Sequence, residues 1–252
     1  MIASVSRPEA WTPFGSRGRR PEPALRLFCL PHAGGGASIY RTWSAALPTD
    51  IDVCPVQLLG RETRAREAPL SRLRALVPAI AEGLLPLLDA PFAFFGHSMG
   101  GLLSFELARY VRRQWGKLPV RLLVAGHRAP HLPRRGSSLH ILPEPHFSQE
   151  LRNLGGTPAE VLDNRELMTL VAPVLRADFA VCETYEYAAD DPLECPISVF
   201  GGENDRMVPP TDLSAWRQHT RSDFRVRVLP GNHFFVRSAP APLLQAVASD
   251  LR

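Results

Sequence analysis

The sequence has one lysine, four cysteines and no long hydrophobic run, and each shortage excludes a class of protein. No apolar run reaches the roughly 18 residues that a membrane-spanning helix needs. Residues 1–23 lack the apolar core of a secretory signal peptide. These absences predict a cytoplasmic protein that does not enter a membrane.

The four cysteines are too far apart to form a metal-binding or disulfide framework. Cys29, Cys54, Cys182 and Cys195 include no CxxC pair, and three of them lie in or beside apolar runs. Buried, reduced thiols are therefore expected, and neither a zinc site nor a set of disulfides is.

The basic residues are almost all arginine, since Lys117 is the single lysine among 29 basic residues. The formal net charge is only +4, and the arginines are scattered apart from a denser stretch at 61–74. No basic face accompanied by stacking aromatic residues is present, which argues against a nucleic-acid partner.

What remains is a chain of 252 residues, 45% of them hydrophobic, which is enough for one large domain. Short apolar runs, each typical of a buried strand, alternate with segments of helical spacing such as 102–111. The runs are at 25–30, 51–58, 91–95, 120–126, 196–202 and 224–231. This alternation predicts an α/β fold with a mostly parallel sheet covered by helices on both faces. We expect a single domain over 24–252, preceded by a flexible arm over 1–23 that is rich in Pro, Gly and Arg.

One interval, 129–191, breaks the alternation. It contains no convincing strand, and its apolar residues have helical spacing. A helical insertion of this length between two strands favours a lid over a binding pocket. The alternative is that these helices only complete the core.

Residues 96–100, Gly-His-Ser-Met-Gly, match the G-x-S-x-G pattern of a nucleophile elbow. The pattern alone is weak, but an apolar strand precedes it and a helix follows, as an elbow requires. Ser98 is therefore the predicted nucleophile. The alternative is a glycine-rich turn with a serine that has no chemical role.

A serine nucleophile needs a histidine base and an acid, and on this scaffold the order along the chain is serine, acid, histidine. His233 follows the last strand in a turn, whereas His219 lies in a probable helix, so His233 is the predicted base. The loop after the run at 196–202 offers Glu203 and Asp205. Asp205 lies deeper in this loop and is favoured, although a turn-capping role would also suit it.

Acyl transfer also needs hydrogen-bond donors for the oxyanion that develops on the substrate. The backbone amide of Met99 is one candidate, and Ala33 supplies the second from the glycine-rich loop at residues 32–38. The loop could instead hold a phosphate group, but it lacks the G-x-G-x-x-G spacing and a following lysine.

The chain resembles the type II thioesterases of polyketide and nonribosomal peptide synthesis, which are α/β-hydrolases. The resemblance runs from about Leu25 to Val236 and is carried by LFCLPHAGGGAS, VQLLGRETR, FFGHSMGGLLSFELAR, LRADF, ETYEY, PISVFGGENDRMV and LPGNHFFV. It implies an α/β-hydrolase fold, a catalytic triad of Ser98, Asp205 and His233, an oxyanion hole at Ala33 and Met99, and a helical lid.

The same resemblance implies hydrolysis of acyl groups from the phosphopantetheine arm of carrier proteins. The enzyme would edit stalled or misloaded acyl units, or release products, without a metal ion or diffusible cofactor, and as a monomer. The arginines at 61–74 could steer acidic carrier proteins, or could form an ordinary solvated face. Two other functions stay open: a general carboxylesterase or lipase, and a noncatalytic partner that docks on a synthase.

Overall fold

A six-stranded parallel sheet forms the centre of the computed structural model, which describes residues 8–15 and 24–252. The strand order is β2-β1-β3-β4-β5-β6, with parallel pairing between each pair of neighbours. The strands are β1 (Leu25–Leu30), β2 (Ile51–Pro55), β3 (Phe92–His97), β4 (Arg121–Ala125), β5 (Ile197–Gly202) and β6 (Phe224–Leu229). All six strands expected from the sequence are present, and the predicted parallel sheet is confirmed.

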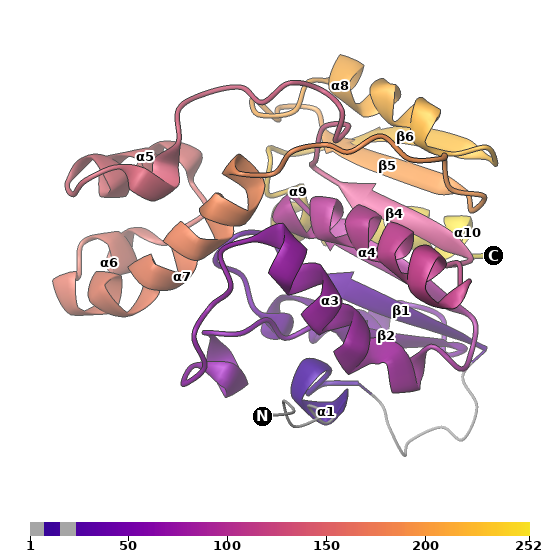
Figure 1. Ribbon diagram of the computed structural model, residues 1–252. Helices are drawn as coiled ribbons and strands as arrows, with labels where there is room; N and C mark the ends of the chain where they lie inside the picture. The colour runs from indigo at the N-terminus through magenta and orange to yellow at the C-terminus, as the bar shows by residue number, and fades with distance from the viewer. Residues whose placement is uncertain (1–7, 16–23) are drawn as a thin grey trace.

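Helices cover both faces of the sheet, because alternate side chains of each strand point to opposite faces. Phe28, Phe94 and Leu122 pack on one face with α3 (Leu73–Leu84) and α4 (Met99–Trp115). These two helices lie in front of the sheet in Figure 1. Side chains such as Phe95 and Leu123 pack on the other face. The elements there are η1 (Ala37–Tyr40), α2 (Trp43–Ala46), α9 (Phe235–Ser238) and α10 (Pro240–Asp250).

The insertion at 129–191 is helical throughout its regular structure and lies between β4 and β5. It contains η4 (Leu139–Ile141), α5 (His146–Leu154), α6 (Ala159–Leu162) and α7 (Arg165–Glu183). Figure 1 shows α5 and α6 projecting beyond the sheet, with α7 running back towards α4. The insertion has a small apolar core of its own, formed by Phe147, Leu151, Leu162, Met168 and Leu175. That it moves as a lid stays a prediction.

The prediction of a flexible arm is wrong for residues 8–15, because these residues pack on the body of the protein. Trp11, at the end of α1 (Pro8–Trp11), is buried, and its carbonyl accepts a 2.7 Å hydrogen bond from the amide of Gln57. The indole ring lies over Gly83 of α3, where a Cβ atom would come within 2.1 Å of it. Burying one indole ring removes a large apolar area from water, and this contact fixes the segment. The rest of the expected arm lies outside the described residues.

Several short helical elements complete the fold. They are η2 (Glu62–Arg64), η3 (Leu85–Leu87), α8 (Pro210–Ser214) and η5 (Ala215–His219). Cys29, Cys54 and Cys195 are buried thiols, as expected, and Cys182 is half-buried. Among the described residues, no helix combines the length and apolar character needed to cross a membrane.

Because all strands are parallel, their carboxyl ends meet at one edge of the sheet, where α/β proteins bind ligands. The glycine-rich loop follows β1, Ser98 follows β3, Asp205 follows β5 and His233 follows β6. The fold thus brings together four segments that are far apart in the sequence.

Candidate active site

Ser98 occupies a strained turn between β3 and α4. Its backbone has a φ of 53° and a ψ of −117°, a conformation that costs a residue with a side chain on the order of 1–3 kcal/mol. The turn is held by a 2.8 Å hydrogen bond from the Ser98 amide to the carbonyl of Ala125. A Cβ atom at Gly96 would lie 1.9 Å from the carbonyl oxygen of Gly100, so this close turn requires the glycine.

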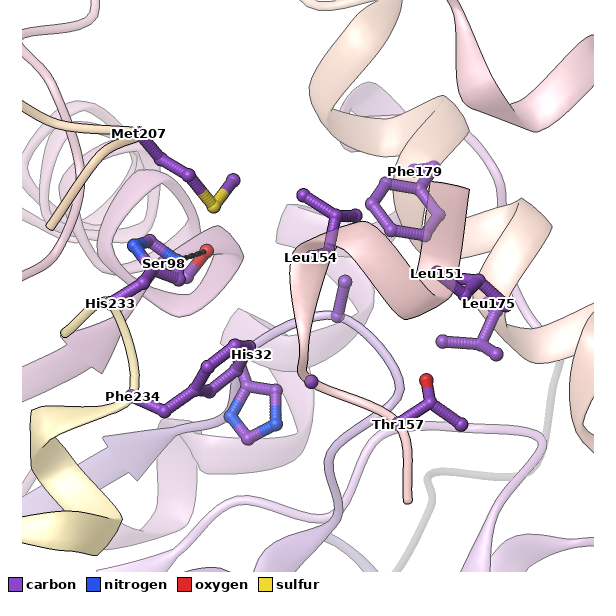
Figure 2. Close-up of a pocket in the computed structure, with 12 residues that line it drawn as sticks. His32, Ser98, Leu151, Leu154, Thr157, Leu175, Phe179, Met207, His233 and Phe234 are labelled. Carbon is purple, nitrogen blue, oxygen red and sulfur yellow. Dashed lines mark hydrogen bonds between the residues drawn. The ribbon is translucent and has the colours of Figure 1, made fainter. Parts of the chain in front are cut away.

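The structure joins Ser98, His233 and Asp205 in one chain of hydrogen bonds. Ser98 Oγ lies 3.0 Å from His233 Nε2, and His233 Nδ1 lies 2.8 Å from Asp205 Oδ2. The second oxygen, Asp205 Oδ1, accepts hydrogen bonds from the amides of Met207 at 2.8 Å and Val208 at 3.1 Å. His233 Nδ1–H therefore donates a hydrogen bond to the carboxylate of Asp205. In this tautomer Nε2 carries no proton and can accept the hydroxyl proton of Ser98. Figure 2 shows the Ser98–His233 contact.

His219 and Glu203, the less favoured candidates for the base and the acid, lie outside this chain of hydrogen bonds. Glu203 is exposed, and its amide donates to the carbonyl of Leu229. His219 ends η5 and is buried among aromatic rings, with Nε2 2.9 Å from His131 Nδ1. The expected polar face position for His219 is therefore wrong, because both ends of the insertion pack over this ring through His131 and Tyr187.

Of the two predicted oxyanion donors, Met99 directly follows Ser98 in the chain and Ala33 lines the same cavity. Met99 is the first residue of α4, so its amide has no partner four residues earlier in that helix. Ala33 follows β1 and lines the same cavity as Ser98. The loop turns sharply just beyond it, with a 2.9 Å hydrogen bond from the amide of Gly35 to the carbonyl of His32.

Two further histidines support His233, and neither is among the site residues predicted from the sequence. The fully buried His97 donates from Nε2 to the carbonyl of His233 at 2.8 Å, and His97 Nδ1 lies 3.4 Å from His32 Nδ1. Burial lowers the pKa of His97 well below its usual value and lowers the pKa of His32 to about 4. Both rings are thus neutral at pH 7. Their positions, directly before Ser98 and directly after Pro31, were the only signal in the sequence.

A cavity of about 50 Å³ adjoins Ser98, with a polar wall and an apolar wall. Ser98 and His233 lie on one side, and leucine and phenylalanine side chains of the insertion face them across the gap (Figure 2). The apolar wall consists of Leu151, Leu154, Leu175 and Phe179. By volume the cavity has room for about three or four water-sized groups, which matches a short acyl chain. Within residues 8–15 and 24–252, no three metal-ligating side chains are grouped to hold an ion.

The arginine stretch at 61–74 is only partly the exposed surface expected from the sequence. Arg61 and Arg64 are buried: Arg61 pairs with Asp178, and Arg64 pairs with Glu67 and lies 4.1 Å from the centre of the Trp11 ring system. Neither can act as a surface charge that steers a partner. Arg66, Arg72 and Arg74 of the stretch are exposed.

Comparison with known proteins shows that the chain as a whole has many relatives of known sequence and structure. The family model for the thioesterase domain matches residues 25–251. The gramicidin S biosynthesis protein GrsT of Aneurinibacillus migulanus is 48% identical, covering 90% of this chain and 89% of its own. The linear gramicidin dehydrogenase LgrE of Brevibacillus parabrevis is 45% identical, covering 92% and 89%. The solved type II thioesterase BorB from the borrelidin biosynthetic cluster has a TM-score of 0.84 at 38% identity, covering 92% and 96%. The predicted α/β-hydrolase fold is confirmed.

Proposed function

We propose that this chain, which belongs to the thioesterase family, hydrolyses acyl thioesters. The acyl groups are carried on the phosphopantetheine arm of carrier proteins in polyketide or nonribosomal peptide biosynthesis. The observation that carries the proposal is the Ser98–His233–Asp205 chain of hydrogen bonds facing an apolar cavity. This arrangement is built for acyl transfer to a serine hydroxyl.

The reaction we propose has two halves. His233 Nε2 removes the proton of Ser98 while Oγ attacks the thioester carbonyl, and the amides of Ala33 and Met99 bind the oxyanion that forms. The carbon–sulfur bond then breaks, and the carrier thiol leaves with the proton from His233. Water then attacks the acyl-serine and gives a proton to His233, and His233 passes this proton to Ser98 Oγ as the ester bond breaks and the acid leaves. Asp205 holds the imidazole ring in the required tautomer and stabilises its protonated form.

The size of the cavity favours editing over the release of long products. An apolar space of about 50 Å³ suits a short acyl unit of the kind that stalls an assembly line. We further propose that the enzyme acts as a cytoplasmic monomer and requires neither a metal ion nor a diffusible cofactor. Any electrostatic steering of an acidic carrier protein by the 61–74 stretch would depend on Arg66, Arg72 and Arg74, which are its exposed arginines.

The name of one relative, a dehydrogenase, raises a different chemistry. A dinucleotide cofactor is commonly bound by a G-x-G-x-x-G loop between a strand and a helix. The glycine-rich loop after β1 lacks that spacing, and the cavity it borders is far smaller than the few hundred Å³ of an ordinary cofactor site. We therefore propose hydrolysis for this chain.

The test compares kcat/KM for three substrates that share one acyl group: a thioester of a carrier protein, a thioester of free pantetheine and an oxygen ester. We expect the carrier-protein substrate to be preferred over both small substrates. A preference for the oxygen ester would indicate a general carboxylesterase instead. Failure of a fluorophosphonate probe to label Ser98 would indicate a noncatalytic partner.

A further inference from the structure

We propose that the buried ion pair of Arg61 and Asp178 is a positioning device that holds the glycine-rich loop so that the amide of Ala33 faces Ser98. The inference rests on the proposed function, because it assigns an oxyanion-binding role to that loop. It goes further by making a helix of the insertion part of the catalytic framework.

The pair itself has the geometry of a strong, two-bond contact. Arg61 Nη1 lies 2.6 Å from Asp178 Oδ2, and Arg61 Nη2 lies 2.7 Å from Asp178 Oδ1. The side chains are 8% and 1% exposed, respectively. Arg61 lies between β2 and η2, and Asp178 lies on α7 of the insertion. Two segments separated by more than a hundred residues thus meet beside the glycine-rich loop.

Both members of the pair also bind the backbone of the glycine-rich loop. The amide of Gly34 donates to Asp178 Oδ2 at 2.7 Å, and Arg61 Nη1 donates to the carbonyl of Gly35 at 3.1 Å. These two loop residues directly follow Ala33. Gly34 has a φ of 78°, which glycine adopts without steric cost, and in this conformation its amide is paired with Asp178.

Two neighbours of Arg61 extend the support along the same loop. Gln57 Oε1 accepts from the amide of Ala37 at 3.3 Å, and Glu62 accepts from the amide and hydroxyl of Ser38. Side chains thus provide hydrogen-bond partners for the loop at four of the five residues 34–38.

Stability alone does not explain why a charged pair lies here. Two apolar residues of similar volume often stabilise a buried position as well as an ion pair does. Apolar side chains, however, could not accept the Gly34 proton or donate to the Gly35 carbonyl. A displacement of about 1 Å in a catalytic group can lower the rate about a hundredfold. The pair therefore serves the geometry of the loop.

The test uses Asp178→Asn and the double variant Arg61→Met with Asp178→Leu, which leaves no unpaired buried charge. We measure kcat and KM for an acyl thioester, together with the affinities of two inert analogues. One is a trifluoromethyl ketone, which Ser98 attacks to form a hemiketal oxyanion. The other is a thioether, which fills the cavity without a carbonyl group.

We expect kcat to fall about a hundredfold in both variants while KM changes less than threefold. The affinity for the ketone should fall in parallel with kcat, and the affinity for the thioether should not change. Asp250→Asn is the matched control, because Asp250 is equally buried and pairs with Arg225 and Arg227 far from the site. The control should lower the melting temperature without changing the ratio of the two affinities.

Several results would overturn the proposal. The first is a folded variant whose kcat and ketone affinity stay within threefold of wild type. The second is an equal loss of affinity for the ketone and for the thioether. The third is a failure of both test variants, and of Arg61→Lys as well, to fold. The last result would make the pair a stability element only. If the wild type bound the ketone but hydrolysed no thioester, the proposed function would fail, and the ratio of affinities would still decide the role of the pair.

Discussion

At Ser98 the strained backbone and the two nearby glycines, Gly96 and Gly100, hold the hydroxyl where His233 can reach it. The positive φ is maintained because the Ser98 amide bonds to Ala125 and the glycines on either side permit contact with adjacent chain. The histidine is held in turn by Asp205 at its ring and by His97 at its backbone carbonyl. Each reacting group is therefore fixed by at least one buried partner.

Asp205→Asn tests the assignment of the acid at this scale. The amide would favour the wrong tautomer of His233, so we expect kcat to fall about a thousandfold or more. Glu203→Gln is the matched control in the same loop, and it should change kcat by less than threefold because Glu203 is exposed. The reverse order of effects would show that the acid has been misassigned.

The sequence predicted the three residues of this hydrogen-bonded chain because each follows a recognisable strand. It could not identify Arg61, Asp178 or His32 as parts of the site, because their roles depend on contacts between distant segments. Arg61 looked like one charge in a basic stretch, and only the fold reveals that it is buried beside Asp178. Pairing over such distances has no signature in the spacing of one chain.

At the scale of elements, the insertion divides into an anchored and a projecting part. Helix α7 is tied to the body through Asp178, whereas α5 and α6 project beyond the sheet and pack mainly on the insertion's own core.

Hydrogen exchange measured by mass spectrometry tests this division. Amides of α5 and α6 should exchange faster than those of β3 and β4, because few contacts oppose their local opening. The half of α7 around Asp178 should exchange more slowly than α5. Equally slow exchange across all of 129–191 would contradict a mobile lid and favour a rigid part of the core.

The apolar wall contributed by the insertion should set the length of the acyl chain. Phe179→Ala removes a large side chain from the cavity wall, so the ratio of kcat/KM for an octanoyl over a propionyl thioester should rise about tenfold or more. Leu170→Ala is the control on the same helix, since Leu170 is 72% exposed and does not line the cavity. An unchanged ratio in Phe179→Ala would show that the wall lies elsewhere.

The regular elements were the easiest to predict, and the irregular ones were not. The apolar runs gave β1 to β5 because a strand buried on both faces must be apolar along its length, whereas the edge strand β6 alternates arginine with apolar residues and is only partly buried. The sequence predicts a flexible arm that includes 8–15, because one tryptophan in a polar, proline-containing stretch gives no periodic signal. Its place depends on a surface at Gly83 that only tertiary structure creates.

At the scale of the whole molecule, buried neutral histidines make stability depend on pH. Burial lowers the pKa of His32 and of His219 to about 4, and lowers the pKa of His97 well below the usual value of about 6.5. The unfolded chain therefore binds more protons than the folded one between these values. Stability is complete above pH 6.5 and is lost as the pH falls towards 4.

Urea denaturation at pH 7 and pH 5.5 measures this dependence. The free energy of unfolding should fall by about 1 kcal/mol for each of these histidines between the two values. His219→Phe fills the same aromatic site without a titrating group and should reduce the fall by about one histidine's share. A variant with the full wild-type dependence would contradict the assignment of His219.

Acyl thioester hydrolysis by this protein requires Ser98 as the nucleophile, and the turnover of Ser98→Ala measures that requirement. With an acyl carrier protein as substrate, we expect kcat to fall by roughly four to six orders of magnitude, because only binding and the oxyanion donors remain. The melting temperature should stay close to that of the wild type, since the alanine keeps the same turn. A folded variant that retained a tenth or more of the wild-type kcat would contradict the account.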